Sequence, residues 1–463
     1  MKAVTELYSI FLEHPVVTTD SRDCPEGSIF FALKGDTFNG NAYAKAALDK
    51  GCAYAVIDEA QYAEDDRYIV VDDVLTTLQQ LAREHRRALN TPIIGITGTN
   101  GKTTTKELVA TVLSKKYNVL YTQGNFNNHI GVPKTLLRLT KEHDIAVIEM
   151  GANHPGEIKT LVEIVEPNCG LITNVGKAHI EGFGSFEGVI RTKGELYDFL
   201  RQKADSKVFI DTDNEHLMGI SEGLNLVPYV GGEVIACDPF LRFRWSPEEV
   251  QDALRASSKV QDASLVQEVL RQGSGEQSSE PVPVPVNVPV PVYEVSTHLI
   301  GAYNMKNMLA AATVGLEFGI TPEQINEALA GYVPTNNRSQ LTITQHNKLI
   351  VDTYNANPTS MMAALHNFVL MSVEPKMAIL GDMGELGSIS HEEHQKIVSY
   401  LQDNHISNVW LVGKEFGKIE SPYRKFANVA DVKEALAKER PEGQYILIKG
   451  SNSNRLFELP ELL

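Results

Sequence analysis

Cysteine is scarce in this sequence, and long apolar runs are missing. The 463 residues include four cysteines, no two of which form a C-x-x-C pair. This spacing argues against a disulfide framework or a zinc site and favours buried thiols in a reducing compartment. No apolar run approaches the ~18 residues that a membrane-spanning helix needs. Glu6 and Glu13 interrupt any apolar leader at the N-terminus. We therefore expect a cytoplasmic protein that does not enter a membrane.

Basic residues are also in deficit. Lysine and arginine number 42 against 59 aspartates and glutamates, and the formal net charge is −17. Such a chain repels polyanions unless a local basic patch overrides the charge. We expect no nucleic-acid partner. A nucleotide is still compatible with this charge, because a phosphate site needs only a few local donors and a metal ion.

The chain is too long for one hydrophobic core, and at roughly 150 residues per domain it predicts about three domains. The helical pattern at 74–89 ends at Asn90-Thr91-Pro92, and a second break surrounds Val333-Pro334-Thr335. Proline and the residue before it disfavour helix, which makes both sites natural boundaries. The predicted domains are residues 1–90, 91–332 and 333–463.

Short apolar strands alternate with amphipathic helices along most of the chain. Strands are expected at 28–33, 53–57, 93–97, 118–121, 145–149, 170–174, 348–352, 376–380, 408–412 and 445–448. Helices are expected at 42–50, 74–89, 103–116 and 303–318. This alternation predicts an α/β fold of helix-covered parallel sheets: a small N-terminal domain, a central domain and a C-terminal Rossmann-like domain. The Pro-Val repeat at 281–286 predicts an extended polyproline-like loop or a bridging β-edge.

A glycine-rich turn is the strongest motif. Its members are Gly98, Thr99, Asn100, Gly101, Lys102, Thr103 and Thr104. The turn follows a predicted strand and opens a predicted helix, which is the context of a phosphate site. Backbone N–H groups would bind phosphate oxygens, Lys102 would supply positive charge, and the Thr103 hydroxyl would ligate Mg²⁺. The spacing is shorter than G-x4-G-K-[ST], since Ile96 stands where that pattern has its first glycine. A plain strand-to-helix turn is the alternative, but it would not need the lysine and the threonines.

Two more candidate side chains follow strands of the same predicted sheet. Glu149 ends the strand at 145–149, and His179 comes after the strand at 170–174. The carboxyl ends of parallel strands share one edge, so both are expected near the glycine-rich turn. A carboxylate and an imidazole there could hold a second divalent ion between nucleotide and substrate. Ordinary polar residues at strand ends are the alternative.

The order and spacing of these and other strings resemble the Mur ligase family, almost from end to end. The further strings are Asp20-Ser21-Arg22, Asn125-Phe126-Asn127-Asn128-His129, Glu149-Met150-Gly151, Lys193-Gly194-Glu195, Asn304 with Asn307, Asp352-Thr353-Tyr354-Asn355-Ala356-Asn357-Pro358 and Leu380-Gly381-Asp382-Met383-Gly384. Within the family they are most similar to the member that adds D-alanyl-D-alanine to UDP-N-acetylmuramoyl-tripeptide. The Asp-Asn-Pro-Arg string of the diaminopimelate-adding member is missing.

The resemblance implies roles in binding ATP and Mg²⁺. Besides the glycine-rich turn, Asn307 would face the adenine, Asp352 the ribose and Arg338 the γ-phosphate. The implied magnesium ligands are Thr103, Glu149, His179 and Lys193, the last as a carbamylated lysine. The implied catalytic residues are Lys102, His179 and Lys193. An ordinary salt-bridging lysine is the alternative for Lys193, and a surface polar residue for Arg338.

The resemblance also implies the substrates. Ser21 and Arg22 would grip the uridine diphosphate, and the further expected substrate contacts are Asn127, Asn128, Asn355 and Asn357. The implied reaction activates a carboxylate as an acyl phosphate, which the amine of the dipeptide attacks. Partners would be these small molecules alone, with the protein acting as a monomer. A sister ligase, a folylpolyglutamate synthase, and a P-loop ATPase or kinase that needs no amine are the alternatives.

Overall fold

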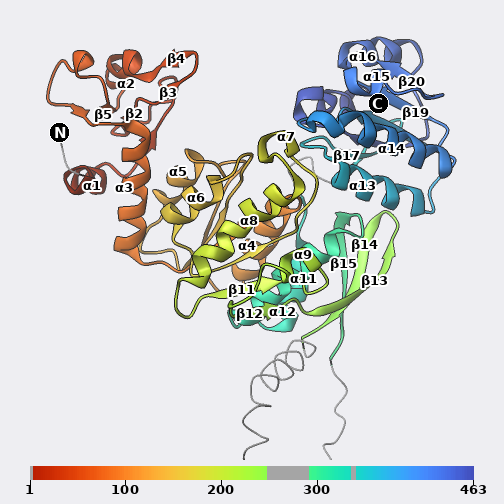
Figure 1. Cartoon of the computed structure of the whole chain (residues 1–463), viewed down its shortest axis with the longest axis horizontal. Helices are drawn as coiled ribbons and strands as arrows, with labels where there is room; N and C mark the ends of the chain where they lie inside the picture. The colour runs from red at the N-terminus through yellow and green to blue at the C-terminus, as the bar shows by residue number, and fades with distance from the viewer. Residues whose placement is uncertain (1–3, 248–290, 335–339) are drawn as a thin grey trace, which may run out of the picture. The chain divides into compact units, whose positions relative to one another are not determined.

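The computed structural model of the chain describes residues 4–247, 291–334 and 340–463. The chain divides into two compact units, and Figure 1 labels their helices and strands. Unit 1 comprises Met1–Val208 and His216–Asn225, and unit 2 comprises Phe209–Glu215 and Leu226–Leu463. The Pro-Val repeat at 281–286 and Arg338 lie outside the described residues. The domain boundaries at residues 90 and 332 stay a prediction.

Unit 1 begins with a parallel sheet of four short strands in the order β1-β2-β5-β6. Their bounds are Val17–Thr18, Ile29–Phe31, Tyr54–Ile57 and Tyr68–Val70, and the helices beside them are α1 (Val4–Glu13) and α2 (Ala44–Asp49). Helix α3 (Val74–Leu89) follows, with the Asp73 carboxylate accepting the Thr76 N–H as its N-cap. Buried His85 and Arg86 of α3 bond to the carbonyls of Leu139 and Val165. Helix α3 is thereby bonded to two segments that connect strands of the next sheet.

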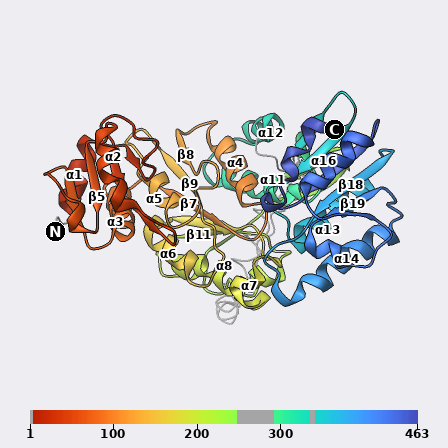
Figure 2. The same ribbon diagram turned by 90° about the horizontal axis from the view of Figure 1, so that it is seen from above.

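The central sheet has six strands in the order β12-β11-β10-β7-β9-β8. In chain order these are β7 (Ile93–Thr97), β8 (Val119–Tyr121), β9 (Ile145–Glu149), β10 (Cys169–Ile172), β11 (Lys207–Ile210) and β12 (Leu226–Pro228). Strands β7 and β9 are parallel and buried at every residue. Helix α4 (Lys102–Leu113) lies on one side of these strands, and α6 (Glu157–Val165) and α8 (Phe186–Arg201) lie on the other (Figure 2). Central strands covered on both faces must be apolar throughout, which explains their sequence.

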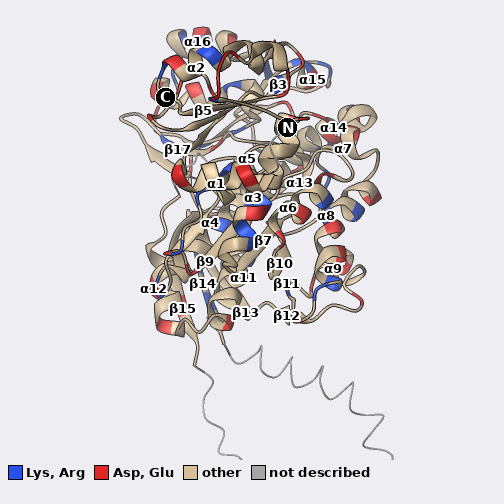
Figure 3. Ribbon diagram, turned by 90° about the vertical axis from the view of Figure 1, so that its left-hand side faces the viewer, with Lys and Arg blue, Asp and Glu red and all other residues tan. Residues whose placement is uncertain are grey.

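Charged side chains of unit 1 lie mainly on its helices and loops, outside the strands of the central sheet. Helices α3 and α8 carry residues of both signs (Figure 3). Within the six strands of the central sheet, all of them described, Glu149 is the sole carboxylate. A buried carboxylate in such a sheet calls for a partner.

Unit 2 contains an antiparallel sheet that the sequence did not predict. Its strands are β13 (Gly231–Cys237), β14 (Phe240–Ser246) and β15 (Tyr293–Ile300), in that order. Helices α11 (Asn304–Glu317) and α12 (Pro322–Gly331) pack beside it. Thr321 caps α12 through a reciprocal capping box with Gln324.

The second sheet of unit 2 has the order β16-β17-β21-β18-β19-β20. Its strands are β16 (Gln340–Ile343), β17 (Lys348–Asp352), β18 (Lys376–Gly381), β19 (Val409–Val412), β20 (Arg424–Phe426) and β21 (Tyr445–Lys449). All neighbours are parallel except β16 with β17. Along β18, Ala378 and Leu380 pack with α13 (Pro358–Leu370) and α14 (Ser390–Asp403), whereas Met377 and Ile379 face α16 (Val429–Lys438).

The predicted α/β class with helix-covered parallel sheets is thus confirmed. In the part of the chain that the structure describes, no helix is long and apolar enough to cross a membrane.

Candidate active site

The glycine-rich turn joins the end of β7 to the start of α4. Gly101 precedes the helix with φ of 78°, and Gly98 has φ of 139°, conformations that L side chains rarely adopt. A Cβ at Gly98 would lie 2.1 Å from Thr173 Oγ1. Beyond the turn, the first N–H groups of α4 have no acceptor within the helix, and the helix dipole adds positive potential there. The turn therefore has the geometry that an anion site requires.

A second loop, after β10, holds this turn in place. The carbonyl oxygen of Asn174 accepts the Thr99 N–H at 2.9 Å, and its side-chain Oδ1 accepts the Asn100 N–H at 3.0 Å. The Thr173 hydroxyl donates to the Asn100 carbonyl at 2.6 Å. Sequence reasoning gave neither Thr173 nor Asn174 a role, and nothing in their local sequence indicates one.

Lys102 folds back over the turn that precedes it. Its Nζ donates to the carbonyls of Gly98 and Thr99 at 2.9 and 3.0 Å. These bonds hold the ammonium group at the turn, where an anion would bind. A point charge on a flexible stem suits phosphate oxygens.

Glu149 lies at the end of β9, where Thr103 and Asn127 meet its carboxylate. Oε1 accepts the Thr103 hydroxyl at 3.2 Å and the Asn127 amide at 2.8 Å. Glu149 is 1% exposed, and its Oε2 is buried with no hydrogen-bond partner among the described residues. An unpaired buried carboxylate oxygen is costly unless a cation or a donor meets it. The arrangement therefore fits a divalent cation with oxygen ligands.

The protein would supply few of the ligands of such a cation. Among the residues that the structure describes, no group of three or more His, Cys, Asp or Glu side chains could hold a metal ion. Mg²⁺ keeps several waters and is commonly bound by one or two protein groups plus substrate phosphates.

Lys193 and His179 meet at the ring of Phe183. Lys193, on α8, is 2% exposed, donates to the Ala152 carbonyl at 3.2 Å and lies 5.1 Å from the centre of that ring. His179 directly precedes the short helix α7 (Ile180–Phe183) with φ of 52°, and its ring contacts the Phe183 ring edge-on with the centres 6.3 Å apart. Burial and the charge of Lys102 lower the pKa of Lys193 to about 7. Much of its amine is therefore neutral near neutral pH.

The remaining expected residues of unit 1 occupy polar turns. Arg22 is exposed and makes a two-pronged ion pair with Asp20, at 2.9 Å from Nε and 2.8 Å from Nη2. This contact holds the pKa of Asp20 far below its ordinary value. The carbonyl of Ser21 accepts Lys50 Nζ at 2.7 Å. Asn128 Oδ1 accepts the N–H groups of Ile130 and Gly131, so this side-chain amide oxygen fixes the backbone at the start of α5 (Gly131–Leu136).

The expected residues of unit 2 lie on α11 and at the end of β17. Asn307 is buried and donates to Asn304 Oδ1 at 2.9 Å. Asp352 accepts Lys449 Nζ at 2.6 Å. Asn355 Oδ1 accepts the Ser451 hydroxyl at 3.5 Å. Asn357 caps α13, where its Oδ1 accepts the Ser360 N–H.

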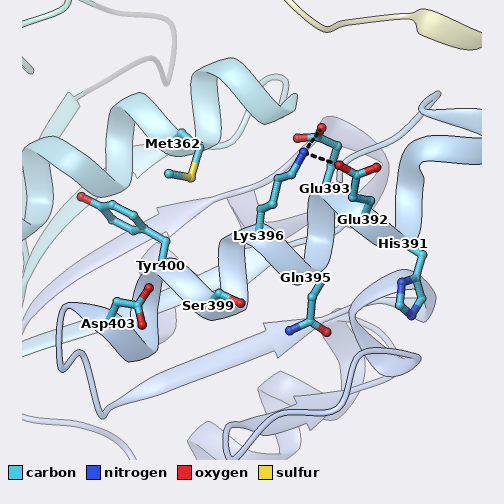
Figure 4. Close-up of a pocket in the computed structure, with 9 residues that line it drawn as sticks. All are labelled: Met362, His391, Glu392, Glu393, Gln395, Lys396, Ser399, Tyr400 and Asp403. Atoms are coloured by element: carbon cyan, nitrogen blue, oxygen red, sulfur yellow. Dashed lines mark hydrogen bonds and ion pairs between the residues drawn. The ribbon is translucent and has the colours of Figure 1, made fainter.

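A surface pocket in unit 2 contains none of the expected residues. It has a volume of about 580 Å³ and is lined by Met362 of α13 and by side chains of α14 (Figure 4). Lys396 bridges Glu392 and Glu393 there (Figure 4). Because these charged groups are already paired, the pocket singles out no ligand.

The strand, the lysine-bearing glycine turn and the carboxylate on the neighbouring strand define a P-loop-type nucleotide-binding protein. Comparison with known proteins gives the family. The model of the Mur ligase middle domain matches residues 96–228. The models of the Mur ligase glutamate ligase domain and the Mur ligase family catalytic domain match 337–452 and 15–86. The chain belongs to the Mur ligase family.

Relatives and solved structures agree over nearly the whole length. The chain is 31% identical to the UDP-N-acetylmuramoyl-tripeptide--D-alanyl-D-alanine ligase of Bacillus subtilis (strain 168), covering 96% of this chain and 92% of that protein. It is 32% identical to the Escherichia coli (strain K12) protein of the same name, covering 99% and 95%. A crystal structure of MurF from Acinetobacter baumannii matches with a TM-score of 0.78 and 27% identity over 96% and 92% of the two chains. MurF of Thermotoga maritima in complex with ADP, 23% identical with a TM-score of 0.79 over 100% and 98%, shares the fold.

Proposed function

We propose that this chain joins D-alanyl-D-alanine to UDP-N-acetylmuramoyl-tripeptide at the expense of ATP, in the synthesis of the peptidoglycan precursor. The observation that carries the proposal is the buried Glu149 carboxylate beside Thr103 and the Lys102 turn. Support comes from relatives of that name that match nearly end to end. A nucleotide-dependent ligase needs a phosphate site and a metal-binding carboxylate, and the Lys102 turn and Glu149 would supply them.

The chemistry follows from the poor reactivity of a carboxylate toward amines. The terminal carboxylate of the tripeptide attacks the γ-phosphorus of ATP, the bond to the bridging oxygen breaks, and ADP leaves. The amine of the dipeptide then attacks the acyl phosphate, inorganic phosphate leaves, and the amine gives up a proton. Lys102 and the α4 N–H groups would bind the phosphoryl oxygens as they gain charge. The turn glycines would let the backbone approach them.

Magnesium is proposed as the cofactor that neutralises the phosphates. Thr103 and Glu149 would hold it, and Glu149 with His179 and Lys193 would hold a second ion. A plain ammonium cannot ligate a cation, so Lys193 would serve as a carbamate. Its neutral amine would attack CO₂ at carbon, with loss of one proton, to give N–COO⁻. The lowered pKa of Lys193 supplies the neutral amine, and the charge of Lys102 that lowers it would stabilise the carbamate anion.

A labelling experiment tests the carbamate. Protein equilibrated with ¹³C-bicarbonate should give a carbamate carbon resonance that the Lys193→Met variant lacks. If both proteins give the same spectrum, Lys193 is an ordinary lysine.

The remaining assignments complete the proposal. Asn307 would contact the adenine, Asp352 the ribose and Arg338 the γ-phosphate. The residues assigned to the precursor and the dipeptide are Ser21, Arg22, Asn127, Asn128, Asn355 and Asn357. The protein would act as a monomer in the cytoplasm, where its four free cysteines stay reduced; light scattering checks the monomer.

Phosphate release tests the reaction. Purified protein with ATP and Mg²⁺ is given UDP-N-acetylmuramoyl-tripeptide, D-alanyl-D-alanine, or both. Release that needs both, with a product heavier by the dipeptide less one water, is expected. Phosphate release that does not depend on the dipeptide would indicate a sister ligase or an ATPase. Lys102→Ala should abolish release, and near-normal ligation by that variant would overturn the scheme.

A further inference from the structure

Strands β17 and β21 end side by side at the carboxyl edge of the second sheet of unit 2. They are parallel neighbours, and the register pairs Asp352 with Lys449, the last residue of each strand. Lys449 Nζ lies 2.6 Å from Asp352 Oδ2. The lysine side chain is 1% exposed and the aspartate side chain 16%. The ammonium group is therefore closed off from water, whereas part of the carboxylate is accessible.

The chain after β21 also fastens the segment that follows Asp352. Residues 449–454, here called the β21 clasp, make further hydrogen bonds to residues 352–356. They include bonds from the Gly450 N–H to the Asp352 carbonyl (3.3 Å), from the Asn452 N–H to the Tyr354 carbonyl (3.1 Å) and from the Ala356 N–H to Ser451 Oγ (3.2 Å). The backbone that carries Asp352 is thus fixed, and the lysine fixes the side chain.

The pairing leaves one carboxylate oxygen available. Lys449 binds Oδ2, and among the residues that the structure describes none hydrogen-bonds to Oδ1. A carboxylate accepts several hydrogen bonds, so Oδ1 can still take a hydroxyl donor. Because the Asp352 side chain is already held in one rotamer, ligand binding would not cost the conformational entropy of ordering it.

We propose that Lys449 positions Asp352 for nucleotide binding and thereby sets the preference for an intact ribose. The inference rests on the proposed function, in which Asp352 accepts a ribose hydroxyl. It adds that the acceptor works because a buried lysine holds it. Lys449 is a positioning residue that acts through Asp352 and does not touch the nucleotide.

The Lys449→Met variant tests this role, because methionine keeps most of the side-chain volume without the charge. Lys376→Met is the matched control. Lys376 begins β18 at the opposite edge of the same sheet, is 9% exposed, and donates to the Val369 carbonyl at 2.9 Å. Both variants lose a largely buried lysine of one sheet, but Lys376 is not bonded to Asp352.

Calorimetric affinities for ADP, 2′-deoxy-ADP and 3′-deoxy-ADP are the first readout. A hydrogen bond to a charged acceptor implies that wild type prefers ADP by about tenfold over at least one deoxy nucleotide. Lys449→Met should lose most of that preference, with little change in affinity for the deoxy nucleotide. Lys376→Met should keep it. In turnover, Lys449→Met should raise the KM for ATP while kcat at saturating ATP changes little, a split that a general loss of structure would not give.

The outcomes separate the inference from the function beneath it. If the folded Lys449→Met protein prefers ADP over the deoxy nucleotides as strongly as wild type does, the inference is wrong but the proposed function still stands. Wild-type protein that binds ADP without preferring the hydroxyls overturns the assignment of Asp352. If Lys449→Met does not fold, Asp352→Asn is compared with Asp352→Asn/Lys449→Met, which lacks the unpaired charge. Equal ADP affinities in these two support action through Asp352, and a further loss in the double variant overturns it.

Discussion

The Thr103 hydroxyl donates to Oε1 of Glu149 at 3.2 Å, while Oε2 of the same carboxylate is buried without a hydrogen-bond partner among the described residues. This contact ties the start of α4 to the end of β9. It also places a hydroxyl oxygen and a carboxylate side by side, and Mg²⁺ prefers oxygen ligands of this kind. Burying this unpaired oxygen lowers the stability of the protein when no cation is bound. Removing the charge of Glu149 should therefore lower activity and raise stability.

Glu149→Gln should lose Mg²⁺-dependent turnover yet melt at a higher temperature than wild type in EDTA. Loss of an outer partner of a metal site alone costs about 10–100-fold, so loss of a direct ligand should cost about 100-fold or more in kcat/KM. Stability should rise because the amide carries no charge to bury. Phosphate release against Mg²⁺ concentration and thermal melts in EDTA measure the two effects.

The control for that substitution is Glu163→Gln, on the exposed side of α6. It should change neither measurement. A Glu149→Gln protein with a wild-type Mg²⁺ response would show that the carboxylate does not bind the ion.

Gly98→Ala should damage the turn, because the new Cβ would meet Thr173 Oγ1 at 2.1 Å and φ of 139° disfavours any side chain. A strained backbone of this kind costs about 1–3 kcal/mol of unfolding free energy. Gly331→Ala is the control, since a Cβ there meets nothing within 4 Å. Urea unfolding and ADP binding are measured for both. Equal effects of the two substitutions would mean that the turn tolerates a side chain.

Arg22→Ala should weaken binding of the UDP precursor, and Arg67→Ala should not. The two arginines form a matched pair, because each is exposed and bonds to an aspartate two residues earlier, Asp20 and Asp65. Loss of a charge-assisted contact to diphosphate should raise the KM for the precursor by about tenfold or more. Steady-state kinetics at varied precursor concentration measure this KM. Similar KM values for the two variants would show that Arg22 does not contact the precursor.

Local sequence predicted the elements that local forces build. The helix at 74–89 matches the observed α3 because Asp73 caps its start and Asn90, with φ of 53°, ends it. The strands at 93–97 and 145–149 match β7 and β9, since central parallel strands are apolar at every position. The glycine-rich turn and Glu149 were found for the same reason: both lie at ends of such strands.

Pairings between distant residues could not be predicted in this way. Asn174 holds the turn at Thr99 and Asn100, and Lys449 holds Asp352, but neither has a periodic pattern or a motif around it. The sheet of β13, β14 and β15 was missed because β14 ends at Ser246 and β15 begins only at Tyr293, with no hairpin turn to announce their pairing. Such features follow from tertiary packing.

The stability of the protein should depend on pH through Lys193. The unfolded chain holds the lysine proton up to its ordinary pKa of 10.5, whereas the folded protein releases it near 7. Between these pH values the unfolded state binds more protons, so the free energy of unfolding rises with pH, and below about 7 the contribution is constant. Lys193→Met should lack this slope and be more stable than wild type at pH 7.

Urea unfolding from pH 7 to 9.5 in CO₂-depleted buffer measures the slope, because subtracting the Lys193→Met values removes all other titrating groups. Lys141→Met, at an exposed lysine, controls for the loss of one positive charge. Adding bicarbonate should then stabilise wild type and not Lys193→Met, because CO₂ bound by the folded state alone shifts the equilibrium toward that state. Parallel curves of unfolding free energy against pH for wild type and Lys193→Met would show that the buried amine does not titrate in this range. No neutral amine would then be available to form the carbamate.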